Sequence, residues 1–426
     1  MKKEISILAF VMLAFATLAL SSASYAQCTG CKIFAVTNDD NPATGLNTAT
    51  VFGYPATGNI IGVSQTLHTG GTGIGGGDFA LTRVATATDD KCLFVSDPGA
   101  STGFPFGDIA GFPGSPGFYG ATPFRIASQD TGLSFYGIGL AVTPSGKYLF
   151  ATLDFSNTIE TFKVAASTCK LTPVHNITAV ADIVGPLAVS SDGKVLIIPG
   201  VTDSAVTAYR IGPTGGLTLI NTFNLLPVSS CTTPGCFPTG VDISEVQSNI
   251  ATVAIGNATP SAPDYITCDL NTIALVALTA CTNNTIAGPG SSLTNVENPF
   301  YNKFGYSATG GIYMGASGDN TGFPCGVSLN PAGPAGVVGA ISSGAYQQPA
   351  STVYCSNAQS YSASATQQYV WQSGVTSGAV NTMYLYKSNG IVVVPFRSLL
   401  NPNANGSQSN IVLSLQALNQ AGIQTR

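Results

Sequence analysis

The stretch LAVTPSGKYLFATLDFSNTIETFKV, residues 140–164, decides the fold of this chain because the chain repeats it. A second stretch, LAVSSDGKVLIIPGVTDSAVTAYRI at residues 187–211, aligns with the first without a gap. The matched positions include apolar, turn and aromatic residues: Leu140 and Leu187, Gly146 and Gly193, Lys147 and Lys194, Phe162 and Tyr209. Self-similarity at a fixed spacing is typical of repeat architectures, in which each unit packs against the next.

Three further segments repeat parts of the same pattern. VATATDDKCLFVSD begins at Val84, NTATVFGY at Asn47, and VDISEVQSNIATVAIGN at Val241. A full unit has an apolar strand, a turn of the S-x-D-G-K kind, a second apolar strand, a loop, an alternating third strand and a more polar fourth strand. Four antiparallel strands that recur about every 45–55 residues predict a propeller blade.

We therefore expect an all-β, seven-bladed β-propeller of four-stranded antiparallel blades, since about 400 residues divided by that period give seven or eight units. The expected single domain covers residues 27–426. Its blades are expected at residues 33–69, 78–130, 137–180, 185–226, 238–290, 293–345 and 350–396. A closing strand at residues 410–418 should pair with the first blade, which would remove the exposed sheet edges of an open ring.

Residues 140–211 resemble the lactonase-type seven-bladed propeller superfamily and its YVTN-repeat relatives. The resemblance implies the propeller fold. It also implies that a lactonase would place a His before one inner strand, an acid in a later blade and an Arg before another inner strand. The corresponding segments here read YGIG before Leu140, VGP before Leu187 and FPTG before Val241, and none supplies His, Glu or Arg. The expected lactonase residues are therefore not matched.

The first 26 residues read as a signal peptide. Two lysines precede an apolar run at residues 5–20, and SSASYA follows with small residues at the positions that a signal peptidase requires. Cleavage after Ala26 would leave Gln27 as the first residue. We expect a secreted, periplasmic or cell-surface protein with no membrane span after cleavage, because no other segment is long and apolar enough to cross a bilayer.

Ten cysteines in an exported chain predict disulfides. Spacing alone does not determine their connectivity, and pairs close in the chain are the natural expectation. The expected pairs are Cys28–Cys31, Cys231–Cys236, Cys268–Cys281, Cys325–Cys355 and, for the remaining two cysteines, Cys92–Cys169.

The charge of the chain excludes one class of partner. Charged residues make up 8% of the sequence, the net charge is −5, and no basic cluster occurs along the chain, which argues against nucleic acid. So few carboxylates also leave few ionisations to lose in acid, and we expect the fold to tolerate acidic surroundings.

The glycine run HTGGTGIGGG, residues 68–77, contains the spacing G-x-G-x-x-G of a dinucleotide-binding loop. That fingerprint needs a helix after the glycines, so that the helix N-terminus meets the pyrophosphate. The residues that follow are of β type and align with the inner hairpins of later repeats. We therefore interpret the run as a flexible crossing from the first blade to the second.

Candidate site residues gather in the loops between second and third strands and in the blade crossings, which open on one face of a propeller. Asp39 and Asp40 are candidate ligands of a calcium ion, although the spacing of a dedicated calcium loop is absent. His68 and Arg83 are the candidate catalytic residues. Candidate ligand-binding residues are the loop acids Asp97, Asp154 and Asp203 and the aromatic pair Phe104 and Phe106, which could form a stacking surface.

These features favour an exported, monomeric propeller that binds a carbohydrate or a peptide on its channel face without turning it over. The unmatched lactonase residues, the low charge and the cysteine content support this expectation. The alternative is a lactonase-like secreted hydrolase with a rearranged active site built on His68 and Arg83.

Overall fold

The computed structural model describes most of the chain between Ile33 and Thr285, and from Asn295 onwards only strands. The described ranges are 33–39, 41–54, 62–73, 84–86, 91–115, 118–127, 138–153, 156–179, 187–200, 204–227, 238–243, 246, 248–257 and 264–285, followed by the strands up to Ser414. The predicted signal peptide and the predicted pairs Cys28–Cys31, Cys231–Cys236 and Cys325–Cys355 lie outside the described residues.

Within these ranges the chain forms seven antiparallel sheets of four strands each and no helix, so the predicted all-β class is confirmed. The described residues accordingly contain no helix that could span a membrane. The first sheet holds β1 (Ile33–Asn38), β2 (Thr48–Tyr54), β3 (Gly62–His68) and the last strand of the chain, β28 (Asn410–Ser414), which pairs with β1.

The other six sheets each hold four strands in chain order. The second has β4 (Val84–Thr86), β5 (Cys92–Asp97), β6 (Asp108–Pro113) and β7 (Phe124–Ala127). The third has β8 (Ile138–Val142), β9 (Tyr148–Leu153), β10 (Thr158–Ala165) and β11 (Lys170–Thr178). The fourth has β12 (Ala188–Val189), β13 (Val195–Gly200), β14 (Ala205–Ile211) and β15 (Leu217–Asn224).

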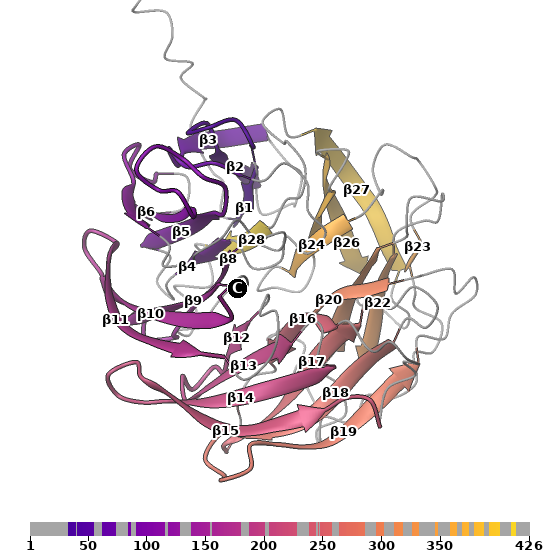
Figure 1. The fold of residues 1–426 in the computed structure, drawn as a ribbon. Coiled ribbons are helices and arrows are strands. Elements are labelled where there is room, and N and C mark those ends of the chain that lie inside the picture. Colours follow the sequence, from indigo (N-terminus) through magenta and orange to yellow (C-terminus); the bar gives the residue numbers. More distant parts are fainter. Residues whose placement is uncertain are drawn as a thin grey trace, which may run out of the picture.

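The fifth has β16 (Pro238–Ile243), β17 (Ile250–Asn257), β18 (Asp264–Asn271) and β19 (Leu278–Thr285). The sixth has β20 (Asn295–Tyr301), β21 (Gly311–Ser317), β22 (Gly326–Pro331) and β23 (Tyr346–Gln347), and the seventh has β24 (Ala358–Ala363), β25 (Tyr369–Gly374), β26 (Ala379–Tyr386) and β27 (Val392–Leu400). The sheets surround a common centre (Figure 1), and the inner strand of each contacts that of the next, with β28 contacting both β24 and β4.

The repeated sequence explains the repeated hairpin. In the third and fourth sheets the second strand follows a tight turn in which Gly146 and Gly193 adopt φ of 67° and 71°. Glycine accepts this left-handed conformation at little cost, which is why the turn of the S-x-D-G-K kind recurs. Apolar side chains of adjacent sheets then pack together, as Phe150 and Ile159 do with Tyr209 of the next sheet. The core therefore lies between neighbouring sheets.

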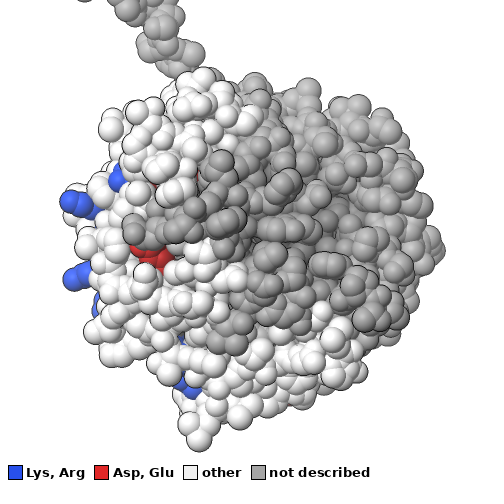
Figure 2. Space-filling view, viewed as in Figure 1, with Lys and Arg blue, Asp and Glu red and all other residues white. Residues whose placement is uncertain are grey.

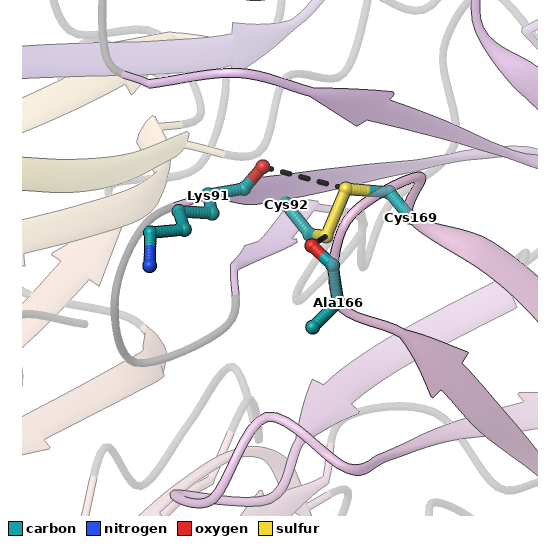
Figure 3. Close-up of a disulfide and its surroundings, with 4 residues drawn as sticks. All are labelled: Lys91, Cys92, Ala166 and Cys169. Atoms are coloured by element: carbon teal, nitrogen blue, oxygen red, sulfur yellow. Dashed lines mark hydrogen bonds between the residues drawn. A yellow bond between two sulfur atoms is a disulfide. The ribbon is translucent and has the colours of Figure 1, made fainter.

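Two predicted disulfides are confirmed. Cys92–Cys169 joins the second sheet to the third, with 5.4 Å between the Cα atoms, and Cys268–Cys281 joins two strands of the fifth sheet. Figure 3 shows the first of them, with the carbonyl oxygens of Lys91 and Ala166 3.3 and 3.7 Å from its two sulfur atoms. A disulfide sulfur carries no proton, so these are contacts rather than hydrogen bonds.

The strand directions give the set of sheets two different ends. One end, which we call the loop face, carries the loops 39–47 and 98–107 and the crossing 69–73, all of which follow β1, β3 or β5. The opposite end, which we call the turn face, carries the turns 143–147, 166–169, 190–194, 212–216 and 272–277.

Candidate functional site

Hydrogen bonds fasten the crossing between the first two sheets to the loops on either side of it. Asn47 donates its backbone N–H to the carbonyl of Gly71 at 3.0 Å, and Gly99 donates to the carbonyl of Thr72 at 2.8 Å. Gly73 donates to the carbonyl of Asn41 at 2.6 Å, and Gly71, Thr72 and Gly73 are all buried. The prediction of a flexible crossing is therefore wrong for residues 70–73. Residues 74–77 lie outside the described residues.

A buried carboxylate, Asp97, lies under this crossing. Its Oδ1 accepts hydrogen bonds from Asn47 Nδ2 at 2.5 Å and from Thr69 Oγ1 at 3.0 Å. Its Oδ2 is buried without a hydrogen-bond partner among the described residues. Gly71 packs directly on the carboxylate, and a Cβ at that position would overlap it. The second glycine of the run, Gly71, is therefore required for packing against Asp97.

A second buried carboxylate faces the first. Asp108 lies directly opposite Asp97 in the register of β5 and β6, and both side chains have no exposed surface. Burial raises the pKa of Asp97 well above its ordinary value, and the nearby charge of Asp108 raises it further. Burial also raises the pKa of Asp108, although Arg125 opposes this change. Both shifts favour the protonated form of these carboxyl groups, and a proton on Asp97 would reduce its repulsion with Asp108.

Arg125 connects the acidic pair to the surface. Its Nε and Nη2 donate to the two oxygens of Asp108 at 3.0 and 2.5 Å, a bidentate ion pair. The same Nη2 donates to Ser101 Oγ at 2.9 Å, and the guanidinium lies 4.1 Å from the centroid of the Phe104 ring. Loop 98–107 is thereby fixed from beneath by one cation that is itself about one-fifth exposed.

The predicted site residues occupy different depths on the loop face. His68, at the end of β3, is exposed next to Thr69. Phe104 is half-buried beside Arg125, and Phe106 is 37% exposed at the tip of the same loop. Asp97 is buried and is not part of the exposed surface of loop 98–107. The remaining candidates, Arg83, Asp40, Asp154 and Asp203, lie outside the described residues.

Asp39, the other described candidate for calcium binding, is buried among hydroxyl groups. Its Oδ2 accepts hydrogen bonds from Thr48 and Thr50, both at 2.6 Å, and its Oδ1 accepts one from Thr37 at 2.9 Å. Across the part of the chain that the structure describes, no group of three or more His, Cys, Asp and Glu is placed to hold a metal ion. Calcium at Asp39 and Asp40 stays a prediction.

Sequence reasoning missed Asn47, Asp108 and Arg125, which complete the cluster around Asp97. A signal was present in the composition. With charged residues at 8% of the chain, two acids bracketing one loop and an arginine in the next strand are an uncommon concentration of charge. What the sequence could not show is that Asn47 binds Asp97, that Asp108 faces Asp97, and that Arg125 contacts both Asp108 and Phe104.

Comparison with known proteins shows which folds this chain resembles. No protein-family model matches the sequence, and no curated protein sequence matches it. Among solved structures, the periplasmic gluconolactonase of Pseudomonas aeruginosa superposes with a TM-score of 0.64 at 14% identity, over 90% of this chain and 99% of that one. A protein proposed to be a 6-phosphogluconolactonase, from Bacteroides fragilis, gives 0.65 at 9% identity, over 90% and 98%. The chain is therefore similar in fold to lactonase-type propellers.

A propeller of another kind is also similar. The Saccharomyces cerevisiae protein Sqt1 has a TM-score of 0.50 at 8% identity, with 82% of this chain and 84% of that chain covered. At such identities the likeness extends to the fold alone, and propellers with this fold host unrelated functions.

Proposed function

We propose that this protein is an exported, monomeric, seven-bladed propeller, formed by residues 27–426 and closed by β28, that binds a carbohydrate or a peptide on its loop face without converting it. The chain of contacts between inner strands and the pairing of β28 with β1 support the closed ring. The predicted signal peptide and the two disulfides support export.

The observation that carries the proposal is the Phe104–Arg125 stack over a buried acidic pair. Arg125 forms an ion pair with Asp108 and donates a hydrogen bond to Ser101 of loop 98–107. These contacts hold the exposed loop in place, so its surface is preorganised. An aromatic ring beside a partly exposed guanidinium offers an apolar face for a sugar ring or a peptide side chain, and hydrogen-bond donors for its polar groups. Phe106 extends this surface into solvent.

Binding to arrays of glycans and peptides tests the proposal, with Phe106→Ala as the variant. Removing an aromatic contact at a binding surface should weaken binding by about tenfold or more. Phe118→Ala is the matched control, because Phe118 is 55% exposed but lies between β6 and β7 on the turn face. Equal binding by the two variants would contradict the assignment of the loop face.

The alternative is a lactonase-like hydrolase that uses His68 and Arg83. Its support is the likeness of fold to the periplasmic gluconolactonase and the position of His68 on the loop face. Hydrolysis of a lactone by the exported chain, abolished in His68→Ala and retained in His175→Ala, would replace the binding proposal with this one. His175 is a suitable control because it is exposed on the outer strand β11.

A further inference from the structure

Charge is divided unequally between the two ends of the ring. Among the described side chains, every Lys and Arg except Arg125 lies at the turn-face end of its strand or in a turn there. The buried acids Asp39, Asp97 and Asp108 lie at the other end. Two exposed acids, Asp192 and Asp269, lie at the turn-face end, and Asp192 is paired with Lys194 at 3.2 Å. In Figure 2 the basic side chains accordingly lie along the outer edge of the face in view, and acidic colour is confined to a small area further in.

Three lysines of the third sheet form the centre of the basic area. Lys147 ends the turn before β9, Lys163 pairs with Tyr148 in the register of β9 and β10, and Lys170 begins β11. All three are exposed. No acidic residue occurs in the turns TPSGKY and AASTCK that carry two of them, so their charge is not cancelled locally.

A strongly apolar turn lies on the same face, two sheets further on. The turn between β18 and β19 reads TIALVA, and three of its aliphatic side chains point into solvent: Ile273 is 59%, Leu275 93% and Val276 53% exposed. Ile250, 50% exposed, pairs with Asn271 at the base of this turn. Clustered aliphatic exposure of this kind, unlike a single exposed leucine, marks an interaction site.

The apolar turn is held rigidly by polar groups on its inner side. Arg210 of the neighbouring sheet donates to the carbonyls of Thr272 and Ala274, the latter at 2.7 Å. Asn271 Oδ1 accepts the N–H groups of Ile273 and Ala274, each at 3.1 Å. Because these backbone groups are hydrogen-bonded within the protein, binding through this turn costs less backbone conformational entropy.

Direct contacts make the lysine area and the apolar turn parts of one surface. Thr272 Oγ1 donates to Asp192 Oδ2 at 2.7 Å, and Lys194 Nζ donates to Asn249 Oδ1 at 3.0 Å, which joins the fifth sheet to the fourth. Tyr148 OH donates to the carbonyl of Pro213 at 3.0 Å, which joins the fourth sheet to the third.

From this arrangement we propose that the turn face binds peripherally to an anionic lipid bilayer. Ile273, Leu275 and Val276 enter the boundary between headgroups and acyl chains, and the lysines of the third sheet contact lipid phosphates. An exposed aliphatic turn with exposed lysines on the same face is the combination that interfacial binding needs. The proposal does not depend on the ligand of the loop face, since it uses the opposite end of the ring.

Co-sedimentation of the chain lacking residues 1–26 with lipid vesicles tests this proposal. Vesicles of phosphatidylcholine mixed with phosphatidylglycerol should bind the protein, vesicles of phosphatidylcholine alone should bind it much more weakly, and added NaCl should reduce the binding. Leu275→Asp should weaken binding by about tenfold or more, because a leucine that would enter the bilayer is replaced by a charge. Lys163→Gln should weaken it by about fivefold.

Leu46→Asp is the matched control, since Leu46 is 59% exposed but lies on the loop face. This variant should bind vesicles like the parent chain. Equal binding to both kinds of vesicle, or equal losses in Leu275→Asp and Leu46→Asp, would overturn the proposal. So would a parent dimer that Leu275→Asp makes monomeric while vesicle binding is unchanged, because the turn would then bind a second copy. Leu275 is nearly fully exposed, and equal thermal unfolding of variant and parent will show that the variant folds.

Discussion

The loop face and the turn face end the same strands, yet their polar groups are arranged in opposite ways. On the loop face the polar side chains turn inward: Asn47, Thr69 and Arg125 surround the buried pair Asp97 and Asp108. On the turn face the inward groups satisfy backbone atoms, and aliphatic and lysine side chains point outward. The strands are a common scaffold, and the connections at each end determine what that end can bind.

The repeat itself reflects this division. The glycine turns at Gly146 and Gly193 recur on the turn face with the same backbone conformation. Loop 98–107 on the loop face has extra residues that the next repeat lacks, and it contains Phe104, Phe106 and Ser101. Repeated residues therefore specify the scaffold, whereas unrepeated residues form the candidate site. The predictions that follow disturb one end at a time.

The largest effect on stability should come from removing the Cys92–Cys169 disulfide on the turn face. Cys92 and Cys169 are 77 residues apart in sequence, and closing such a loop is worth about 4.5 kcal/mol in the chain-entropy model. The double change Cys92→Ser and Cys169→Ser should lower the free energy of unfolding by up to this amount in urea titration.

The matched control is the other described disulfide. Cys268 and Cys281 are 13 residues apart, so replacing both by serine should cost about 3 kcal/mol in the same model. A larger loss from this short link than from Cys92–Cys169 would show that chain entropy does not decide the stability of the turn face.

The repeat, the two disulfides and the crossing show which parts of the fold the sequence could predict. The repeat at residues 140–211 was enough to predict four-stranded antiparallel sheets, because the hairpin turns and apolar strands recur at fixed positions. Two cysteine pairs followed from the chain-local spacing and from elimination. The flexible crossing was predicted wrongly, because the hydrogen bonds that Gly99 donates to Thr72 and that Gly73 donates to Asn41 involve loops distant in sequence.

The next largest effect is expected from a substitution of Gly71 on the loop face. Alanine there would place a methyl group on the carboxylate of Asp97 and displace it from Asn47 and Thr69. We expect Gly71→Ala to lower the free energy of unfolding by about 3 kcal/mol, since it combines overpacking with lost buried hydrogen bonds. Urea titration of the purified variant measures this loss.

Gly103→Ala separates packing from backbone strain. Gly103 has φ of 81°, and a Cβ there would meet nothing within 4 Å. Its replacement should cost only about 1 kcal/mol, the ordinary penalty for alanine in the left-handed region. Losses of equal size at Gly71 and Gly103 would contradict the close contact between Gly71 and Asp97.

The candidate site was predicted less completely than the fold, for a physical reason. Phe104, Phe106 and Asp97 could be chosen from residue type and loop position. Asp108 and Arg125 could not, because an acid at a strand end and an arginine within a strand have ordinary solvated positions as well. Only the pairing of β5, β6 and β7 brings them together.

The smallest effect concerns pH and distinguishes the roles of the two acids. The folded pKa of Asp97 is raised by burial and by Asp108, whereas an unfolded aspartate titrates near about 3.9. Between these values the unfolded chain releases a proton that the folded chain keeps, so the free energy of unfolding falls as pH rises through this window. Lowering the pH therefore raises the contribution of Asp97 to the free energy of unfolding, in keeping with the expected acid tolerance of the chain.

Asn in place of Asp97 mimics the protonated acid, because its oxygen still accepts from Asn47 and its amide can donate toward Asp108. Asp97→Asn should therefore reduce the fall in stability as pH rises above about 4, and at neutral pH it should be more stable than the parent. Asp108→Asn should be destabilised by about 1–3 kcal/mol, since Arg125 loses its carboxylate. Urea titrations across pH compare the three proteins. If Asp97→Asn kept the parent's pH dependence, the pair would not hold a proton, and the loop face would differ from the turn face only in shape.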